Sequence, residues 1–304
     1  MSNINKTISK KYAILSSIIV ILAVILVLTI LLKNRGYSLP TLKAINSNIS
    51  EIKINRGTNE TLSIKLNEGK WILNEEYIAD SDIIESMTNA LNLIKPVEII
   101  SRGEDDKEKY KLLDEELLTV IAIDNSLKEL RNIKFGMKAT LGNNVYAQID
   151  KDKNIYLLGN LSSNPKDIFD KNEDDIINKT ISSIRNDKIN KITVSYNNKD
   201  YTLEKSESTN WLKVWNNSTV KVDYLYSPIY TIANFKADGL IRENLDKNLA
   251  LYKIEIFADN DFVLYEILNK NNNYEVSLSN DNNRYYINDA TFSNLKEAID
   301  NIIK

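Results

Sequence analysis

The chain has 304 residues, a length that is enough for one large or two smaller globular domains. Its formal net charge is −3, and 43 % of its residues are hydrophobic and 27 % are charged. It contains no cysteine and no histidine, which excludes disulfides, thiolate zinc sites, Ser-His-Asp triads and histidine-ligated metals. Its 8 glycines form neither GxGxxG nor GxxxxGK[ST], and there is no basic excess. We therefore expect no nucleotide, no nucleic acid, no cofactor, no metal site and no catalytic residues.

The first predicted element is an apolar run from Tyr12 to Leu32, in which only Ser16, Ser17 and Thr29 are polar. Its 21 residues would form a helix about 30 Å long, which matches the hydrocarbon core of a bilayer. The run is longer than a secretory h-region and is not followed by a small-residue cleavage site. We therefore expect a retained, single-pass transmembrane helix, with the lipid bilayer as its partner.

Basic residues lie on both sides of this run, three in the flank 1–11 and three in the spacer 33–48. The free α-amine adds one more positive charge to the flank, and positive charge favours the cytoplasmic side. We therefore expect a short cytoplasmic flank at 1–11 and an extracytoplasmic C-terminal portion, on the periplasmic or outer face of the cell membrane.

After the spacer, residues 49–184 combine strand and helix patterns. Strands are predicted where apolar and polar residues alternate, at 49–54, 62–66, 118–123, 130–135, 145–149 and 155–158. A helix is predicted at 81–95, with Asp80 or Ser81 as its N-terminal cap. The order Asn-Pro at the start of 164–184 predicts a second helical stretch there.

The pattern then starts again. Residues 189–194 repeat the apolar spacing of 49–54 at an offset of 140, and Trp211 follows Trp71 at the same offset. A shared offset at two separate places indicates an internal duplication. The chain after the spacer is then two versions of one unit.

Two further correspondences support this duplication. Asp223 follows Trp211 much as Asp80 follows Trp71. Later in each unit, Tyr285-Tyr286-Ile287 answers Ile155-Tyr156-Leu157.

The many short turns that contain Asn and Asp favour antiparallel hairpins over parallel crossovers. The predicted fold class is therefore α+β. It consists of an N-terminal transmembrane helix followed by two tandem copies, 49–184 and 189–304, of a mainly antiparallel sheet unit with about two helices each.

Aromatic residues are the candidate site residues. Tryptophans can stack on sugars or anchor an interface, but their recurrence at one repeat position favours the core. The repeat-equivalent core or interface candidates are Trp71, Asp80, Trp211 and Asp223. The second copy holds ten of the 16 tyrosines, and this asymmetry marks a possible binding face, although strands also favour tyrosine for packing. The tyrosines of that face are Tyr224, Tyr226, Tyr230, Tyr285 and Tyr286.

Acidic residues suggest two other kinds of site. Asp150, Asp152 and Asn154 begin like a calcium loop, but the loop lacks the glycine at position 6 and the glutamate at position 12 that would complete it. We interpret this segment as a solvated hairpin turn. Paired carboxylates for glycoside hydrolysis need a defined separation, which the acidic clusters of this chain do not specify.

Several short motifs resemble an uncharacterised bacterial family of single-span proteins with a duplicated extracytoplasmic domain of unknown function. They are Trp71-x-Leu73, Tyr77-x-Ala79-Asp80, Tyr110-Lys-Leu112, Ile133-Lys-Phe-Gly136, Val145-Tyr146-Ala147 and Ile155-Tyr156-Leu157-Leu158. The likeness covers most of the first copy and extends more weakly into the second. Lys111 departs from it, because the family often has glycine there, and no proline follows in Glu115-Glu116.

The resemblance implies a partner role without catalysis, because such proteins are commonly encoded beside ABC-2-type permeases and gliding-motility-type auxiliary subunits. We therefore expect a membrane-anchored extracytoplasmic accessory protein associated with an ABC-type transporter or an envelope complex. Two alternatives stay open. One is a cell-wall glycan-binding or carboxylate-dependent glycan-processing domain, and the other is a structural spacer.

Overall fold

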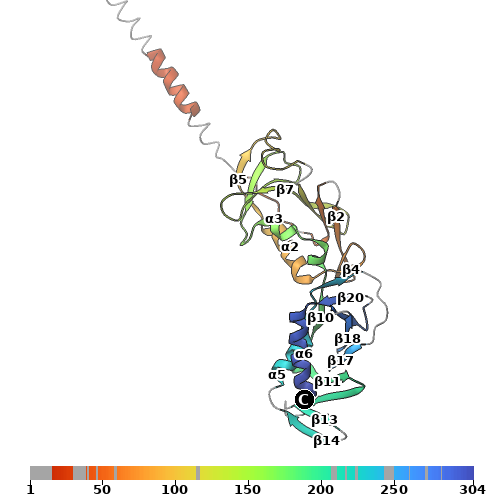
Figure 1. Cartoon of the computed structure of the whole chain (residues 1–304). Helices are drawn as coiled ribbons and strands as arrows, with labels where there is room; N and C mark the ends of the chain where they lie inside the picture. The colour runs from red at the N-terminus through yellow and green to blue at the C-terminus, as the bar shows by residue number, and fades with distance from the viewer. Residues whose placement is uncertain are drawn as a thin grey trace, which may run out of the picture.

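The computed structural model describes residues 16–29, 39, 41–45, 47–57, 60–113, 117–206, 211–215, 218–222, 225–242, 250–259, 261–270, 273–281 and 283–304. After the helical residues 16–29, two units of mixed α and β structure follow one another along the chain (Figure 1). Each has its own core, formed by side chains between Ile49 and Ile177 in the first unit and between Ile181 and Ile302 in the second. The predicted α+β class with large antiparallel sheets is confirmed.

The first unit is built on a nine-stranded antiparallel sheet with the order β4-β3-β2-β1-β6-β7-β8-β9-β5. Its strands are β1 (Ile49–Arg56), β2 (Glu60–Asn67), β3 (Lys70–Leu73), β4 (Tyr77–Ile78), β5 (Lys95–Ser101), β6 (Leu118–Asp124), β7 (Glu129–Lys138), β8 (Val145–Ile149) and β9 (Ile155–Gly159). Its helices are α2 (Ser81–Leu93), α3 (Pro165–Phe169) and α4 (Glu173–Ile176). Helix α2 buries an apolar stripe in the core, as its 3.6-residue period predicts.

The second unit is built on another nine-stranded antiparallel sheet, with the order β14-β13-β12-β11-β17-β18-β19-β20-β16. Its strands are β11 (Ile189–Tyr196), β12 (Lys199–Lys205), β13 (Trp211–Trp215), β14 (Ser218–Val222), β16 (Gly239–Ile241), β17 (Ala250–Ala258), β18 (Phe262–Lys270), β19 (Asn273–Leu278) and β20 (Arg284–Ile287). Its helices are η1 (Asn186–Lys188), α5 (Tyr226–Ala233) and α6 (Asp289–Ile303). When β11 is set against β1, the two sheets have the same strand order.

Local sequence explains several of these elements. Asn197 and Asn198 join β11 to β12 with φ angles of 50° and 60°, the conformation that a two-residue hairpin turn requires and that asparagine tolerates. Asp80 caps α2, because its side chain accepts a hydrogen bond from the backbone N–H of Asp82 at 3.0 Å. Asn164 caps α3 in the same way, with Pro165 at the first helical position.

The helix start predicted at Asn164-Pro165 is confirmed, but the predicted extent of the helical stretch to residue 184 is wrong. The chain instead forms α3, then α4, and then the strand β10 (Thr180–Ser183), which pairs with β15 (Asn234–Lys236). The cause is tertiary pairing, because Ile177 already bridges back to Ala79 and the following residues bond to a strand of the second unit. Such partners override a local helical preference.

The acidic segment that begins at Asp150 is a hairpin turn between β8 and β9. Asp152 Oδ1 accepts a hydrogen bond from the backbone N–H of Asn154 at 2.9 Å, and Asp152 Oδ2 accepts one from the Tyr156 hydroxyl at 2.5 Å. Burial and this hydrogen bond raise the pKa of Tyr156. The carboxylate of Asp152 therefore closes a turn.

A turn with the same hydrogen bonds precedes β20 in the second unit. Asp281 Oδ1 accepts from the backbone N–H of Asn283 at 2.9 Å, and Asp281 Oδ2 accepts from the Tyr285 hydroxyl at 2.6 Å. Tyr285 therefore occupies the position of Tyr156. The sequence alignment that matches Tyr286 to Tyr156 is therefore wrong by one residue.

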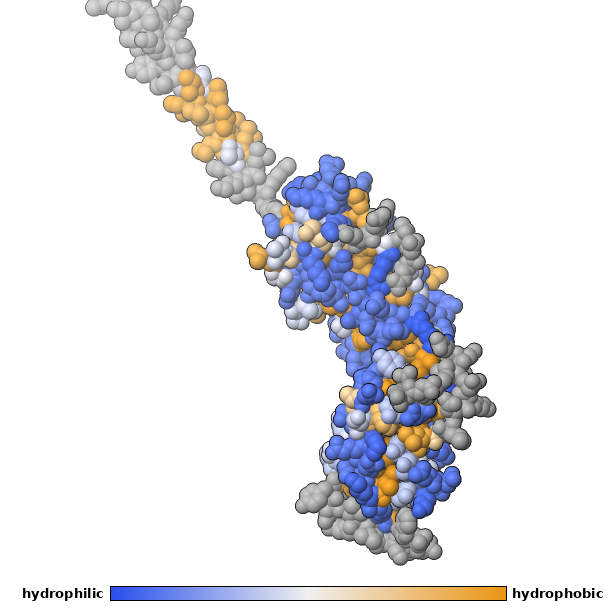
Figure 2. All heavy atoms as spheres, in the orientation of Figure 1, coloured by the Kyte–Doolittle hydropathy of each residue, from blue (hydrophilic) through white to orange (hydrophobic). Residues whose placement is uncertain are grey.

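The helical residues 16–29 carry aliphatic side chains that are all exposed (Figure 2). In the part of the chain that the structure describes, none of the helices combines the length and apolarity needed to cross a bilayer. The flank 1–11 and both ends of the predicted span 12–32 lie outside the described residues.

Part of the predicted spacer contacts the first unit. Leu42 and Ile45 pack against the first core. The backbone carbonyl of Lys43 accepts a hydrogen bond from Arg131 Nη2 at 2.6 Å, and Arg131 is itself buried and paired with Asp150 at 3.1 Å. The end of this segment is therefore bound to the fold.

Gly136 lies in β7 where another segment of the chain passes close to the strand. A Cβ atom at this position would overlap the carbonyl oxygen of Tyr110 and would lie 3.0 Å from the side chain of Leu112. The same carbonyl accepts a hydrogen bond from the backbone N–H of Met137 at 2.9 Å. Lys111, which lies between Tyr110 and Leu112 in the chain, has a φ of 54°, in the left-handed region that favours glycine.

We predict that Gly136→Ala destabilises the first unit by about 2 kcal/mol, because the methyl group displaces the segment around Tyr110. The unfolding midpoint of the full-length chain in mild detergent, followed by circular dichroism, should fall by about 4 to 8 °C. Lys134→Ala, at a half-exposed position of the same strand, is the matched control and should change it much less. Equal midpoints for both variants would contradict the proposed close approach.

Candidate binding site between the two units

The connector between the units is hydrogen-bonded to both of them. The backbone N–H of Asn178 donates to the carbonyl of Ile78 in the first unit at 2.8 Å. The carbonyl of the next residue, Lys179, accepts from the backbone N–H of Ala237 in the second unit, also at 2.8 Å. Two consecutive residues are thus held by different units, so no free linker separates them.

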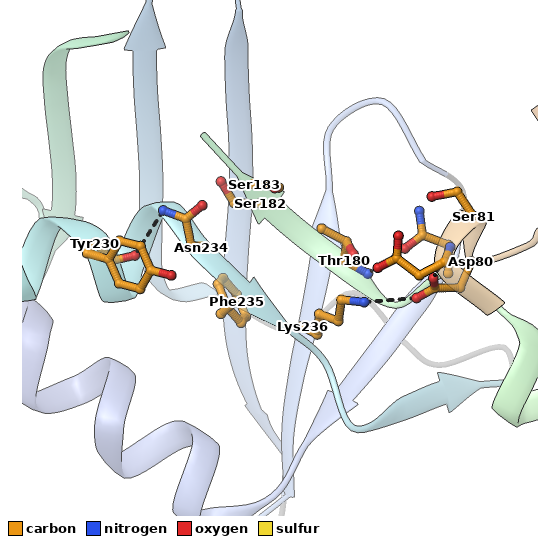
Figure 3. Close-up of a pocket in the computed structure, with 11 residues that line it drawn as sticks. Asp80, Ser81, Thr180, Ser182, Ser183, Tyr230, Asn234, Phe235 and Lys236 are labelled. Atoms are coloured by element: carbon orange, nitrogen blue, oxygen red, sulfur yellow. Dashed lines mark hydrogen bonds and ion pairs between the residues drawn. The ribbon is translucent and has the colours of Figure 1, made fainter. Parts of the chain in front are cut away.

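Asp80 connects the units through its side chain. While Oδ1 caps α2, Oδ2 accepts a hydrogen bond from Lys236 Nζ at 2.8 Å, across the junction (Figure 3). The Asp80 side chain is 13 % exposed and that of Lys236 is 56 % exposed. Burial alone would raise the pKa of Asp80, but the bonds from Lys236 and from the backbone of Asp82 outweigh burial and lower it.

A second ion-pair cluster spans the junction. Arg242 follows β16 of the second unit. Its Nη2 atom lies at 2.9 Å from Oε1 of Glu173 and at 2.8 Å from Oδ1 of Asp174, at the start of α4. Glu173 also accepts a hydrogen bond from Asn74 Nδ2 at 2.9 Å. Because Arg242 and Asp174 are more than half exposed, we assign this cluster a small share of the stability.

A pocket of about 510 Å³ lies at this junction. The start of α2 forms one end, the strands β10 and β15 form the floor, and Tyr230 stands at the other end (Figure 3). Its lining is rich in hydroxyl, amide and charged groups: Asp80, Ser81, Asp82, Asn178, Thr180, Ser182, Ser183, Tyr230, Asn234, Phe235 and Lys236. These groups suit a polar ligand or a polar segment of a partner protein.

A second pocket, of about 550 Å³, lies beside the start of α5 and is more aromatic. Its lining is Arg185, Asn186, Asp187, Lys205, Trp211, Tyr226 and Tyr230. Tyr226 and Tyr230 are four residues apart and therefore share one face of α5, while Ile229, Ile232 and Ala233 are buried in the core. Tyr230 lines both pockets.

The structure brings only some of the predicted site residues together. Asp80 and Tyr230 line the junction pocket, and Trp211, Tyr226 and Tyr230 line the aromatic pocket. The two tryptophans among the predicted site residues are half-buried. Trp71 in β3 packs against the first core, and Trp211 in β13 packs against the second.

The remaining tyrosines do not join this site. Tyr285 is only 4 % exposed and is hydrogen-bonded to Asp281, so its hydroxyl is occupied in the core. Tyr286 is 45 % exposed on β20, outside the lining of both pockets. Asp223 and Tyr224 lie outside the described residues.

Sequence reasoning missed the charged partners of the site. Lys236 and Arg242 meet residues of the first unit that are 156 and 69 positions away in the chain, and no local pattern signals such pairs. Asn186 and Asp187 of the pocket lining belong to η1, a short turn that the sequence did not predict, and Arg185 precedes it. Within the described residues, no group of three or more carboxylates could hold a metal ion.

Comparison with known families found one match. The sequence profile described as Domain of unknown function (DUF4340) matches residues 71–249. The matched stretch begins at Trp71 in β3 and contains the connector, α5 and the residues that line both pockets. Searches of curated proteins and of solved structures found no match.

We predict that Asp80 makes the junction sensitive to acid. Its pKa is lowered in the folded chain, so its stabilising effect is complete above its unfolded pKa, about 3.9, and is lost as the pH falls towards the lower folded value. Asp80→Asn removes this charge but keeps a good helix cap. The variant should therefore lose less thermal stability than the wild type between about pH 5 and pH 3.

Two comparisons complete this test, with unfolding midpoints measured across the same pH range. Lys236→Met removes the cation that lowers the pKa of Asp80 in the folded chain, so the folded and unfolded pKa values come closer and the loss of stability in acid should be smaller than in the wild type. Asp105→Asn removes an exposed carboxylate of the first unit and should leave the profile unchanged. If Asp80→Asn and Asp105→Asn give the same profile, the proposed role of Asp80 is wrong.

Proposed function

This chain belongs to the family described as Domain of unknown function (DUF4340), and from that premise we propose that it is a membrane-anchored, extracytoplasmic accessory protein. In this role it binds a membrane-protein partner, such as an ABC-type permease or its auxiliary subunit, and catalyses no reaction. The resemblance of its short motifs to single-span proteins encoded beside such permeases supports the choice of partner.

The exposed apolar helix at residues 16–29 is the main support for a membrane anchor. Its aliphatic side chains from Ile18 to Leu28 are about half exposed or more. Leaving such side chains in water rather than burying them costs about 1.5 to 3 kcal/mol each. The predicted span 12–32 is long enough to bury them in lipid, and the charge balance favours an extracytoplasmic C-terminal portion.

The two units support a docking role. Their equal strand order and the offset of 140 between Trp71 and Trp211 support the proposal that they are tandem copies of one unit. The hydrogen-bonded connector at Asn178 and Lys179 holds the copies together, so a partner meets one continuous surface. A pre-organised surface binds with a smaller loss of conformational entropy than two loosely linked domains.

We predict that Leu22→Arg combined with Ile25→Arg releases the chain from membranes. One arginine at the centre of a span costs about 2.5 to 3.5 kcal/mol on insertion scales, and this double variant places two there. The measurement is the fraction of chain in the membrane pellet after alkaline extraction. The matched control is Leu127→Arg with Leu141→Arg, at two leucines of the first unit that are each 83 % exposed.

The control variant should remain in the pellet, as the wild type does. If the double variant of the helix also remains there, lipid does not cover residues 16–29 and the anchor is wrong. A reporter that is active only outside the cytoplasm, fused after Lys304, tests the orientation in the same cells.

We predict that crosslinking in intact cells captures a membrane-protein partner. Full-length chain purified in gentle detergent should carry a permease or envelope subunit, identified by mass spectrometry. Leu22→Arg with Ile25→Arg should lose this partner, because it no longer shares the membrane. Capture of no membrane protein by the wild-type chain would contradict the accessory role.

A further inference from the structure

The aromatic pocket beside α5 has features that the accessory role does not require. Its rings are accessible, because Tyr226 is 72 % exposed and Tyr230 is 54 % exposed, and Trp211 beside them is half-buried. The three rings line one pocket, which has a volume of about 550 Å³. That volume is within the range of sites that hold small organic ligands.

The charged groups of this pocket are already paired with the protein. Arg185 donates from Nε and Nη2 to the two carboxylate oxygens of Asp187, at 3.1 and 2.8 Å. Lys205 Nζ donates to the backbone carbonyl of Asp187 at 2.8 Å. Because Arg185 and Asp187 neutralise each other and Lys205 is tied to a carbonyl, the aromatic rings are the main binding groups that remain in the pocket.

A polar side chain lies beside these rings. Asn186 Nδ2 donates to the backbone carbonyl of Tyr226 at 3.2 Å, which fixes the orientation of the amide and ties η1 to the start of α5. Asn186 and Arg185, which both belong to the lining, give the pocket a polar edge next to its aromatic rings.

We propose that this pocket binds a sugar ring of a neutral glycan. A pyranose presents an apolar C–H face that covers an aromatic ring, and a rim of hydroxyls that donate to and accept from planar side chains such as asparagine and arginine. An anion would have to compete with Asp187 for Arg185. Glycan binding is additional to the proposed accessory role and does not depend on the partner protein.

The experiment uses the full-length chain in lipid nanodiscs. Three neutral probes are titrated by calorimetry: the β-1,4-linked tetramer of N-acetylglucosamine, cellotetraose and maltotetraose. At least one should bind, and its affinity should be nearly the same in about 0.05 M and about 0.5 M NaCl, because salt does not screen a neutral ligand.

Tyr226→Ala and Tyr230→Ala remove exposed rings and should each weaken binding by about fivefold or more. Phe262→Ala is the matched control, because this ring in β18 is 49 % exposed and lies outside the pocket lining. It should change the affinity less than about twofold. The unfolding midpoints of all three variants are measured first, and a variant that melts like the wild type is a valid test of binding.

Three results overturn the proposal: no binding of any probe, equal affinities of the wild type and both tyrosine variants, or an affinity that falls steeply with salt. A failure to capture a membrane-protein partner has no bearing on these titrations. The two proposals can therefore fail separately.

Discussion

The arrangement of the two units depends on the backbone of the connector. Asn178 is hydrogen-bonded to β4 of the first unit, and Lys179 is hydrogen-bonded to the residue after β15 of the second unit. The peptide that joins these two residues is therefore fixed at both ends. Two groups of side chains add to this constraint: Asp80 pairs with Lys236, and Arg242 pairs with Glu173 and Asp174. Next to this connector, main-chain hydrogen bonds pair β10 with β15, and these two strands form the floor of the junction pocket.

Elements that depend on nearby residues could be predicted from the sequence. The strand pairs beginning at Ile49 and Ile189 follow from alternating apolar residues, and α2 follows from its apolar stripe and the Asp80 cap. The segment around Thr180 could not be predicted, because it becomes a strand only through pairing with Asn234–Lys236, more than 50 residues later. The junction pocket needs the same pairing, so the sequence could suggest Asp80 and Tyr230 as candidates but not that they line one pocket.

The tyrosines show the limit of composition as a guide to a site. Their excess in the second unit drew attention to a binding face, but the fold separates them by environment. Tyr226 and Tyr230 reach solvent because they lie opposite the buried stripe of a short amphipathic helix. Tyr285 is identical in type but closes a turn with Asp281 in the core. Burial and partners assign these roles, and neither can be counted from a sequence.

Tyr230 belongs to the walls of both pockets, and its backbone carbonyl accepts a hydrogen bond at 3.3 Å from Asn234, two residues before Lys236. A ligand that displaced this ring in one pocket would therefore change the wall of the other. Two ligands coupled in this way would alter each other's affinity by the same factor. A substitution of Tyr230 changes both pockets at once, whereas a substitution of Asp80 or Tyr226 changes only one of them.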